Sequence, residues 1–506
     1  MAIDDGARWP VASFTFGSAL HWWRREIPDS IALDVDGETL TFEELAAWSG
    51  RVAHMLHHAE GVGEGDFVSA VGINSLDYAV LLVALARIGA IGAPLSFRSS
   101  VPEISEAVKK FAPALVFHDA ERAEAVRDGV GDKAQALCRD FSILRDLRHG
   151  EPVSHDIVVA RDAPVFVINT SGSTAKSKSV IYTNYGLMTY ACEFVVMEPR
   201  CGKGATVLSL GPFSSASGYL LMMQFLATGV TVVIDTKFTP ERALPILQEK
   251  KVTMMLGVPI FFEQIAAMPG FADADLSSLH FGQVAGAPVS RSLQDKWLEK
   301  GVLLRQGYGS SEVGGGWAAR DNTALAEPEK AGRGGPFNGF AVMRDDGTFA
   351  EPGEVGELVF QGASLMGGYW SDADATTAAM RNGWFLTGDI GKIDAAGNVT
   401  FVDRKKDIII SGGLNISAAE VEQAAMACPK VTEVAVIAIK DEKFGETPLA
   451  IVHGAATLEA DEVIAACRQS LAGYKVPRKI VLYEEPLPRL PSGKIAKPLL
   501  RQIYGS

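Results

Sequence analysis

A loop rich in hydroxyl groups begins at Asn169 and ends at Lys178. It reads Asn-Thr-Ser-Gly-Ser-Thr-Ala-Lys-Ser-Lys and follows the apolar run 164–168, which predicts a strand. Hydroxyl and ammonium groups together bind phosphate oxygens through hydrogen bonds and charge. Residues 163–192 contain no Asp or Glu, so no nearby carboxylate in the sequence opposes the two lysines of the loop. The segment predicts a polyphosphate site, with a solvated Ser/Thr loop as the alternative.

The loop resembles the phosphate loop of the adenylate-forming superfamily, which includes acyl-CoA synthetases, luciferases and the adenylation domains of peptide synthetases. The usual form there is TSGSTGxPKG, and the Walker pattern GxxxxGK[ST] is absent from this chain. Ala175, Ser177 and Ser179 replace the usual Gly, Pro and Gly, so we expect a loop of altered shape that still binds ATP. The ATP-binding residues implied by the resemblance are Thr170, Ser171, Gly172, Ser173, Thr174 and Lys178.

Further signatures of the superfamily follow in the expected order, and this order is more specific than any single match. The segment YGSSE at 308–312 resembles the family's YGxTE motif. The resemblance implies that Tyr308 stacks on adenine, that Ser311 contacts the α-phosphate and that Glu312 binds Mg²⁺. Each role suits its residue type, because a base prefers an aromatic face and a hard cation prefers a carboxylate. The family's segment beside the adenine corresponds to Gly286, Ala287 and Pro288.

Two later signatures imply a ribose site and a hinge. Asp389 ends the segment WFLTGD, which resembles the family's TGD signature, and would accept hydrogen bonds from the ribose hydroxyls. The run DRKKD begins 14 residues further on and matches the family's hinge region, although such a run alone is usually a solvated turn. By the resemblance Arg404 lies near the ribose and phosphates, and Lys406 is the pivot. Gly412 and Gly413 would line the pantetheine tunnel.

Lys494 completes the series of signatures in the segment PSGK, which resembles the PxxxxGK element near the family's C-terminus. A fixed cation lowers the cost of bringing a carboxylate up to a triphosphate where water screens poorly. With Ser311 and Glu312, this lysine forms the predicted catalytic set. The implied reaction uses a carboxylate and MgATP to make an acyl adenylate and pyrophosphate, after which the thiol of CoA takes the acyl group and AMP leaves.

The acyl pocket is expected in the run GPFSSASG at 211–218, where many acyl-CoA synthetases carry PLFHxxG. Small serines then replace the usual aromatic and His, which favours a bulky aromatic, alicyclic or polycyclic acid over acetate. Refilling of that space by Phe213 or Tyr219 is the alternative. Free α-amino acids are not expected as substrates, because no Asp stands in this run to pair with an ammonium. Glycines 314–316 are expected to add room at the same pocket. The residues predicted to line the pocket are Ser214, Ser215, Gly218, Gly314 and Gly315.

The elements that must position these residues alternate between β-rich runs and helix-like stretches. Runs such as 67–73, 114–117 and 231–234 predict an α/β fold of layered, mainly parallel sheets with helices. Near the end the pattern changes to a small α+β unit. We therefore expect a large N-terminal adenylate-forming domain at 1–403, a hinge at 404–406 and a small mobile α+β C-terminal domain at 407–506. The elements expected there are strands at 398–403, 434–439 and 449–453 and helices at 418–427 and 459–471.

The composition is ordinary for a soluble globular protein. The 506 residues include 61 acidic and 47 basic side chains, so the net charge of −14 disfavours nonspecific binding to nucleic acid or anionic membranes. Five scattered cysteines and no basic-apolar leader indicate a cytoplasmic protein with reduced thiols. The apolar stretch 79–91 is too short for a membrane span and reads as a buried helix. The expected partners are a small carboxylic acid, ATP and CoA, and a homodimer is left open.

Three other functions share the same first half-reaction or the same fold. The chain could pass the acyl group to a carrier protein, act as a luciferase-like oxidase, or bind a small molecule without catalysis. The four residues Lys494, Asp389, Glu312 and Arg404 favour the catalytic interpretations over the last one. The choice of acid and the base that deprotonates the CoA thiol are left open by the sequence.

Overall fold

The computed structural model describes residues 14–151, 153, 158–170, 178–286, 289–489 and 495–505. These residues form two compact units. Unit 1 takes in the described residues up to 170, those from 178 to 340, and 360–383. Unit 2 takes in 341–359 and the described residues from 384 onward. The expected division at a hinge of residues 404–406 stays a prediction.

Eight described strands of unit 1 form one sheet in the order β14-β13-β12-β11-β9-β10-β1-β2. The six strands from β13 to β1 run parallel, and the two outer strands pair antiparallel to their neighbours. Their bounds are β1 Ile31–Val35, β2 Glu38–Thr41, β9 Thr206–Ser209, β10 Thr231–Ile234, β11 Met254–Gly257, β12 Phe281–Val284, β13 Leu303–Ser310 and β14 Gly315–Ala318.

A second sheet of unit 1 has the order β6-β5-β3-β4-β7-β8, in which only the last pair of strands is antiparallel. Every residue of the apolar strands β3 and β4 is buried, as expected of parallel strands covered on both faces. The α/β fold with mainly parallel strands is thereby confirmed. The bounds are β3 Phe67–Val71, β4 Ile91–Leu95, β5 Leu115–His118, β6 Cys138–Asp140, β7 Pro164–Thr170 and β8 Lys178–Thr183.

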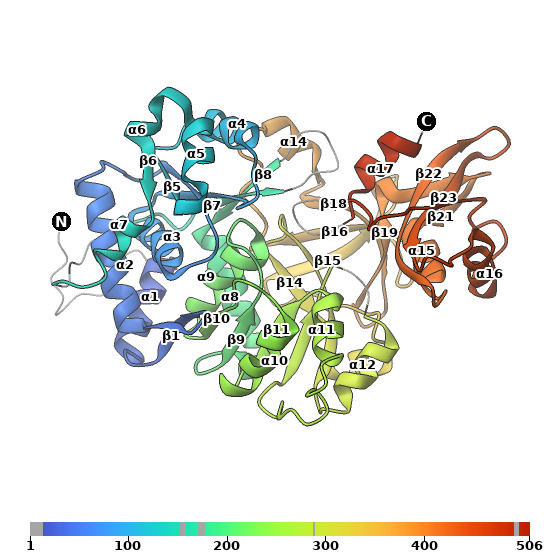
Figure 1. The fold of residues 1–506 in the computed structure, drawn as a ribbon, viewed down its shortest axis with the longest axis horizontal. Helices are drawn as coiled ribbons and strands as arrows, with labels where there is room; N and C mark the ends of the chain where they lie inside the picture. The colour runs from blue at the N-terminus through green and yellow to red at the C-terminus, as the bar shows by residue number, and fades with distance from the viewer. Residues whose placement is uncertain are drawn as a thin grey trace. The chain divides into compact units, whose positions relative to one another are not determined.

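Helices cover these sheets and supply the apolar cores (Figure 1). Trp297 and Phe262, on two neighbouring helices, pack with Met255 and Leu304 of the larger sheet in one buried cluster. The helices of unit 1 are α1 Phe16–Glu26, α2 Phe42–His58, α3 Leu76–Ile88, α4 Val101–Phe111, α5 Ala123–Val130, α6 Ala134–Leu137, α7 Ser142–Arg145, α8 Asn184–Met197, α9 Leu221–Leu226, α10 Pro240–Glu249, α11 Pro259–Ala266, α12 Arg291–Leu298, α13 Asp321–Ala326 and α14 Ala373–Ala378.

The apolar stretch 79–91 divides between a helix and a strand. Helix α3 is buried along its whole length and ends where Gly89 adopts a φ of 70°, a left-handed conformation that favours glycine. Strand β4 then begins at Ile91. The one charge in the stretch, Arg87, donates to the carbonyl of Ala46 at 2.5 Å and to Ser49 Oγ at 2.8 Å. Among the described residues, no helix combines the length and apolarity needed to cross a membrane.

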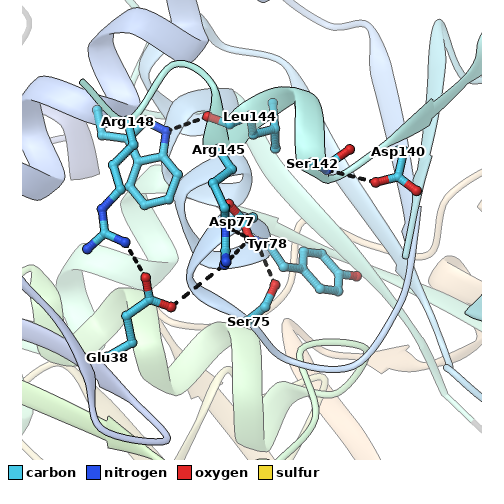
Figure 2. Close-up of polar contacts among 10 residues, drawn as sticks. Glu38, Ser75, Asp77, Tyr78, Asp140, Ser142, Leu144, Arg145 and Arg148 are labelled. Carbon is cyan, nitrogen blue, oxygen red and sulfur yellow. Dashed lines mark hydrogen bonds and ion pairs between the residues drawn. The ribbon is translucent and has the colours of Figure 1, made fainter. Parts of the chain in front are cut away.

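Two arginines fasten the segment around α7 to the rest of unit 1 (Figure 2). Arg145 Nη2 lies 2.7 Å from Asp77 Oδ2 on α3, and Arg148 forms an ion pair with Glu38 on β2. Trp48 of α2 donates its indole N–H to the carbonyl of Leu144 at 2.8 Å. These polar contacts act together with the burial of Phe141 and Leu144 to hold the segment in place.

Unit 2 contains a sheet in the order β21-β20-β23-β22, with β24 beside β23. Apolar side chains of α15 and α16 pack with the sheet in one cluster, and Leu500 of α17 belongs to a second cluster with other residues of β22 and β23. The small α+β unit expected from the sequence is confirmed. Its elements are β20 Ile408–Ser411, β21 Leu414–Ser417, α15 Ala418–Met426, β22 Val431–Asp441, β23 Gly445–Gly454, α16 Ala460–Ser470, β24 Lys479–Leu482 and α17 Lys497–Tyr504.

A further five-stranded sheet carries the predicted ribose and hinge residues. Its order is β15-β16-β18-β17, and β19 pairs with β18. The bounds are β15 Asn338–Met343, β16 Gly356–Gly362, β17 Met380–Arg381, β18 Trp384–Ile393 and β19 Val399–Arg404.

Candidate active site

The two ends of the predicted phosphate loop meet in an antiparallel hairpin. Thr170, the last residue of β7, stands opposite Lys178, the first residue of β8, and donates its hydroxyl to the Lys178 carbonyl at 3.2 Å. One position that departs from the family pattern is well accommodated, because the buried Ser179 donates to Asn169 Oδ1 at 2.5 Å. The remaining predicted residues of this loop, Ser171, Gly172, Ser173 and Thr174, lie outside the described residues.

Lys178 and Glu312 are brought together through a third residue, Tyr369. The Lys178 ammonium lies 4.4 Å from the centroid of the Tyr369 ring, a cation–π contact. The Tyr369 hydroxyl donates to Glu312 Oε1 at 3.1 Å. Burial raises the pKa of Tyr369 and the nearby Glu312 charge raises it further, so the phenol remains a neutral donor. Our sequence reasoning did not select Tyr369, since no motif it considered contains that residue.

The predicted adenine and metal residues lie on or just after strand β13. Tyr308 is buried and packs edge-on against Phe340, with the ring centroids 5.3 Å apart. The carbonyl of Ser311 accepts a hydrogen bond from the Tyr182 hydroxyl at 2.8 Å. This hydrogen bond helps to hold the backbone at Ser311 in a defined position beside Glu312. Gly286 follows β12, whereas Ala287 and Pro288 lie outside the described residues.

The donor set at Glu312 suits a magnesium ion that arrives with a nucleotide. Within the ranges that the structure describes, no group of three or more His, Cys, Asp or Glu side chains is placed to hold a metal. Magnesium in proteins is often bound through one or two carboxylates together with substrate phosphates. A single carboxylate, with the Lys178 ammonium held near it through Tyr369, fits that mode of binding.

The glycines predicted to widen the acyl pocket permit close packing instead. A Cβ on Gly314 would stand 2.2 Å from the Ser364 carbonyl oxygen, and one on Gly315 would stand 2.1 Å from the Tyr190 ring. A Cβ on Gly218 would stand 2.1 Å from the Pro212 carbonyl oxygen. The expectation that Gly314 and Gly315 add empty space is therefore wrong on that side of the chain. Whether these glycines line an acyl pocket with their other atoms stays a prediction.

The serines of the predicted pocket lie in a turn before α9. Ser214 and Ser215 are half-buried, and Ser215 Oγ donates to the Pro212 carbonyl at 2.8 Å. Phe213 packs edge-on against Tyr78 at 5.2 Å, and Tyr219 stacks on Phe166 at 4.0 Å. These contacts commit both large rings to the core of unit 1. Residues 216–220 form a π-helix, a local geometry that is frequent at functional sites.

Asp389 and Arg404, predicted to meet the ribose, are direct cross-strand neighbours in unit 2. Strands β18 and β19 place them opposite each other, with Arg404 Nε 2.7 Å from Asp389 Oδ1. Asp389 is buried, and the half-exposed guanidinium is the charge beside it. The structure therefore brings these two predicted residues together.

Ion pairs also surround the predicted pivot Lys406. Lys405 Nζ lies 2.9 Å from Glu357 Oε2, and Asp407 pairs with Arg501 of α17. Burial lowers the pKa of the Lys406 ammonium, and the neighbouring cations, Arg404 and Arg501 among them, lower it further. Lys406 is thus a partly desolvated cation between two paired neighbours.

The remaining predicted residues of unit 2 lie further along the chain. Gly412 and Gly413 form the two-residue turn between β20 and β21, with φ values of 59° and 80°. Two consecutive positive φ values explain glycine at both positions. Lys494, the predicted catalytic lysine, lies outside the described residues, as do its neighbours 490–493. Its position relative to Glu312 stays a prediction.

Comparison with protein families identifies the class of the molecule. The model of the AMP-binding enzymes matches residues 20–370, and that of the AMP-binding enzyme C-terminal domain matches residues 420–494. The chain therefore belongs to the AMP-binding enzyme family. The superfamily resemblance inferred from the motifs is confirmed.

Individual relatives of this chain include named CoA ligases. A feruloyl-CoA synthase from Amycolatopsis sp is 36% identical over 487 residues, which cover 95% of this chain and 97% of the relative. A long-chain-fatty-acid–CoA ligase, FadD13, from Mycobacterium tuberculosis is 32% identical, covering 92% of this chain and 93% of the relative. The chain thus groups with the CoA-ligase members of the family.

Several solved structures share the fold of this chain. ATP-bound MatB from Rhodopseudomonas palustris has a TM-score of 0.87 and 25% identity, covering 97% of this chain and 99% of that chain. The o-succinylbenzoate CoA synthetase MenE from Bacillus subtilis, in complex with the acyl adenylate OSB-AMP, has a TM-score of 0.85 and 26% identity, covering 96% and 97% respectively. MenE in complex with ATP and magnesium ion has a TM-score of 0.83 and 26% identity, covering 94% of this chain and 98% of that chain.

Proposed function

We propose that the protein is an ATP-dependent carboxylic acid:CoA ligase that works through an acyl adenylate. The observation that carries this proposal is the cluster of Lys178, Tyr369 and Glu312, which sets a cation and a carboxylate beside the hairpin of the phosphate loop. The CoA-ligase relatives support CoA as the acceptor.

In the first step a carboxylate oxygen of the acid attacks the α-phosphorus of ATP, and the bond to the β-phosphate bridging oxygen breaks. Lys178 and Lys494 would offset the charge that gathers on the phosphates, while Glu312 would hold the magnesium ion. Magnesium, when bound, neutralises phosphate charge and stabilises the leaving pyrophosphate. No general base is needed, because the attacking carboxylate is already ionised.

In the second step the thiol sulfur of CoA attacks the acyl carbon, the carbon–oxygen bond to AMP breaks, and the thiol proton is released. Asp389 and Arg404 would hold the ribose and phosphate of the adenylate during this step. We assign the pantetheine path to the turn at Gly412 and Gly413 and the pivot to Lys406, by the family resemblance.

A bulky aromatic, alicyclic or polycyclic acid is the proposed substrate. Support comes from the small side chains of Ser214 and Ser215 and from relatives named feruloyl-CoA synthase, indoleacetate–CoA ligase and 2-succinylbenzoate–CoA ligase. The similarity to FadD13 makes a long-chain fatty acid the second candidate. A cytoplasmic location belongs to the proposal, supported by five free cysteines.

A panel of acids tests the proposal. Ferulate, indoleacetate, 2-succinylbenzoate, a long-chain fatty acid and acetate are each incubated with the protein, MgATP and CoA, and pyrophosphate, AMP and acyl-CoA are measured. The proposal expects equal amounts of the three products from at least one aromatic acid and little turnover of acetate. If an acid stimulates pyrophosphate release but no CoA thioester forms, the acceptor is a molecule other than CoA. If none of the acids in the panel stimulates pyrophosphate release, the ligase assignment is contradicted.

A further inference from the structure

We propose that Tyr369 is a positioning residue that holds Glu312 for magnesium and Lys178 for the nucleotide phosphates. The inference rests on the proposed function, because both neighbours are assigned to the MgATP site. It extends that function to a residue outside the motifs from which the site was predicted.

The backbone of Tyr369 is fixed to the strand that carries Lys178. Residues 367–370 run antiparallel along β8: the Gly367 N–H donates to the Ile181 carbonyl at 2.9 Å, and the Trp370 N–H donates to the Ser179 carbonyl at 2.8 Å. Val180 and Tyr369 form a β-bridge between these hydrogen bonds. Tyr369 is therefore held as firmly as a strand residue, only two positions from Lys178 in register.

The segment before Tyr369 holds the backbone that follows Ser311. The Met366 N–H donates to the Glu312 carbonyl at 2.8 Å, and Ser364 Oγ donates to the Val313 carbonyl at 2.6 Å. Residues 364–369 thus donate three hydrogen bonds to Glu312 and its neighbour, one from a backbone N–H and two from side-chain hydroxyls. This arrangement makes the Glu312 carboxylate and the Lys178 ammonium parts of one rigid group.

The phenol links the two charges without neutralising either. A hydroxyl that donates to a metal-ligating carboxylate fixes the rotamer and leaves the other carboxylate oxygen to face the ion. The ring face attracts the Lys178 ammonium but supplies no counter-charge, so the ammonium keeps its full charge for phosphate oxygens. The hydroxyl contacts Glu312 and the ring contacts Lys178, so two substitutions can test the two contacts independently.

Tyr369→Phe removes the hydroxyl and keeps the ring, whereas Tyr369→Leu removes both. Tyr78→Phe is a matched control, because the buried Tyr78 also donates its hydroxyl, in this case to the Ala70 carbonyl at 3.2 Å. Binding of a nonhydrolysable ATP analogue is measured by calorimetry with excess Mg²⁺ and with EDTA. Thermal unfolding is followed for every variant, so that a loss of folding is detected directly.

We expect Tyr369→Phe to lower the magnesium-dependent gain in analogue affinity about tenfold and to leave the affinity in EDTA unchanged. Tyr369→Leu should weaken binding under both conditions, and Tyr78→Phe should match the wild type under both. In turnover, Tyr369→Phe should raise the Mg²⁺ concentration for half-maximal pyrophosphate release about tenfold, while thioester formation from synthetic acyl-AMP keeps its rate.

A wild-type magnesium response in Tyr369→Phe would overturn the inference, and so would an equal loss in Tyr78→Phe. A different result would contradict the proposed function. If the wild-type protein binds the ATP analogue with Mg²⁺ but releases no pyrophosphate with any acid, the ligase assignment is refuted. The calorimetric comparison of the Tyr369 variants would still be valid.

Discussion

Two pairs of opposite charges in this molecule are arranged differently. In unit 1 a neutral phenol stands between Lys178 and Glu312, touching one through its ring and the other through its hydroxyl. In unit 2 the guanidinium of Arg404 meets the Asp389 carboxylate directly at 2.7 Å. A direct pair satisfies its own charges, whereas a phenol-bridged pair keeps both charges for ligands. The first arrangement suits phosphate and metal, and the second suits neutral ribose hydroxyls.

The largest effect is expected at Lys494, the predicted catalytic lysine. Lys494→Ala should slow acyl-adenylate formation by about 10²-fold or more, because it removes one preorganised charge at the transferring phosphate. Thioester formation from synthetic acyl-AMP should survive. Single-turnover assays of each half-reaction measure both, with Lys475→Ala as the control, since Lys475 pairs with Glu420 at 2.6 Å. Equal losses in the two half-reactions would contradict this assignment.

Removing one negative charge from each pair tests the comparison directly. Glu312→Gln should cut the magnesium-dependent gain in affinity for an ATP analogue about 30-fold, because it removes a metal ligand. Asp389→Asn should raise the KM for ATP about tenfold at every magnesium concentration, because it weakens hydrogen bonds and leaves Arg404 unpaired. Titrations of Mg²⁺ and ATP on both variants supply the data. If Glu312→Gln and Asp389→Asn respond to Mg²⁺ in the same way, the proposed difference in function between the two charge pairs is contradicted.

A substitution that stiffens the backbone at Lys406, the predicted pivot, should affect only the second half-reaction. Lys406→Pro fixes φ near −65° and restricts the preceding residue, so thioester formation should slow roughly tenfold while adenylation is retained. Lys406→Ala, which keeps backbone freedom, is the control for loss of the side chain. Rapid-quench assays of each half-reaction decide the matter, and an equal slowing of both steps in the proline variant would argue against a rotating unit.

The smallest effect is expected at the altered phosphate loop. Restoring the family residues with Ala175→Gly and Ser177→Pro should leave ATP affinity and turnover within about twofold, because the hydroxyl groups and Lys178 persist. Ser179→Gly should cost more stability than either, since it removes the hydrogen bond to Asn169. Calorimetric titration and thermal unfolding measure these changes. A large loss on restoring the loop would show that its present form serves a specific purpose.

The fold class could be predicted because buried parallel strands leave short apolar runs in the sequence. The strand expected at 231–234 has the same bounds as β10, and the helix expected at 418–427 corresponds to α15. Ordered motifs were enough to identify the family, because each combines several residue types at fixed spacing. Asp389 and Arg404 were predicted to share a ligand, and the antiparallel pairing of their strands explains why they meet.

Contacts made by tertiary packing were beyond the sequence. Tyr369 and Glu312 are 57 residues apart, and nothing local marks the tyrosine as a partner of that carboxylate. At Gly314 and Gly315 the sequence was misleading in another way, because small residues suggested empty space where Ser364 and Tyr190 are packed. A sequence shows which side chains are small, but only packing shows what occupies the volume beside them.

Hydrogen bonds at the N-terminus of α15 connect this helix to Asp403 at the end of β19. Asp403 Oδ2 accepts hydrogen bonds from Ser417 Oγ at 2.8 Å and from the Ala419 N–H at 3.0 Å, although Asp403 precedes the pivot and the helix follows it. A rotation at Lys406 that carries α15 away from β19 must break both bonds and expose a buried carboxylate and a helix N-terminus to water. If the chain does rotate at this predicted pivot, the strength of the cap would set the populations of the two orientations. Domain movement in this enzyme would begin as the uncapping of a helix.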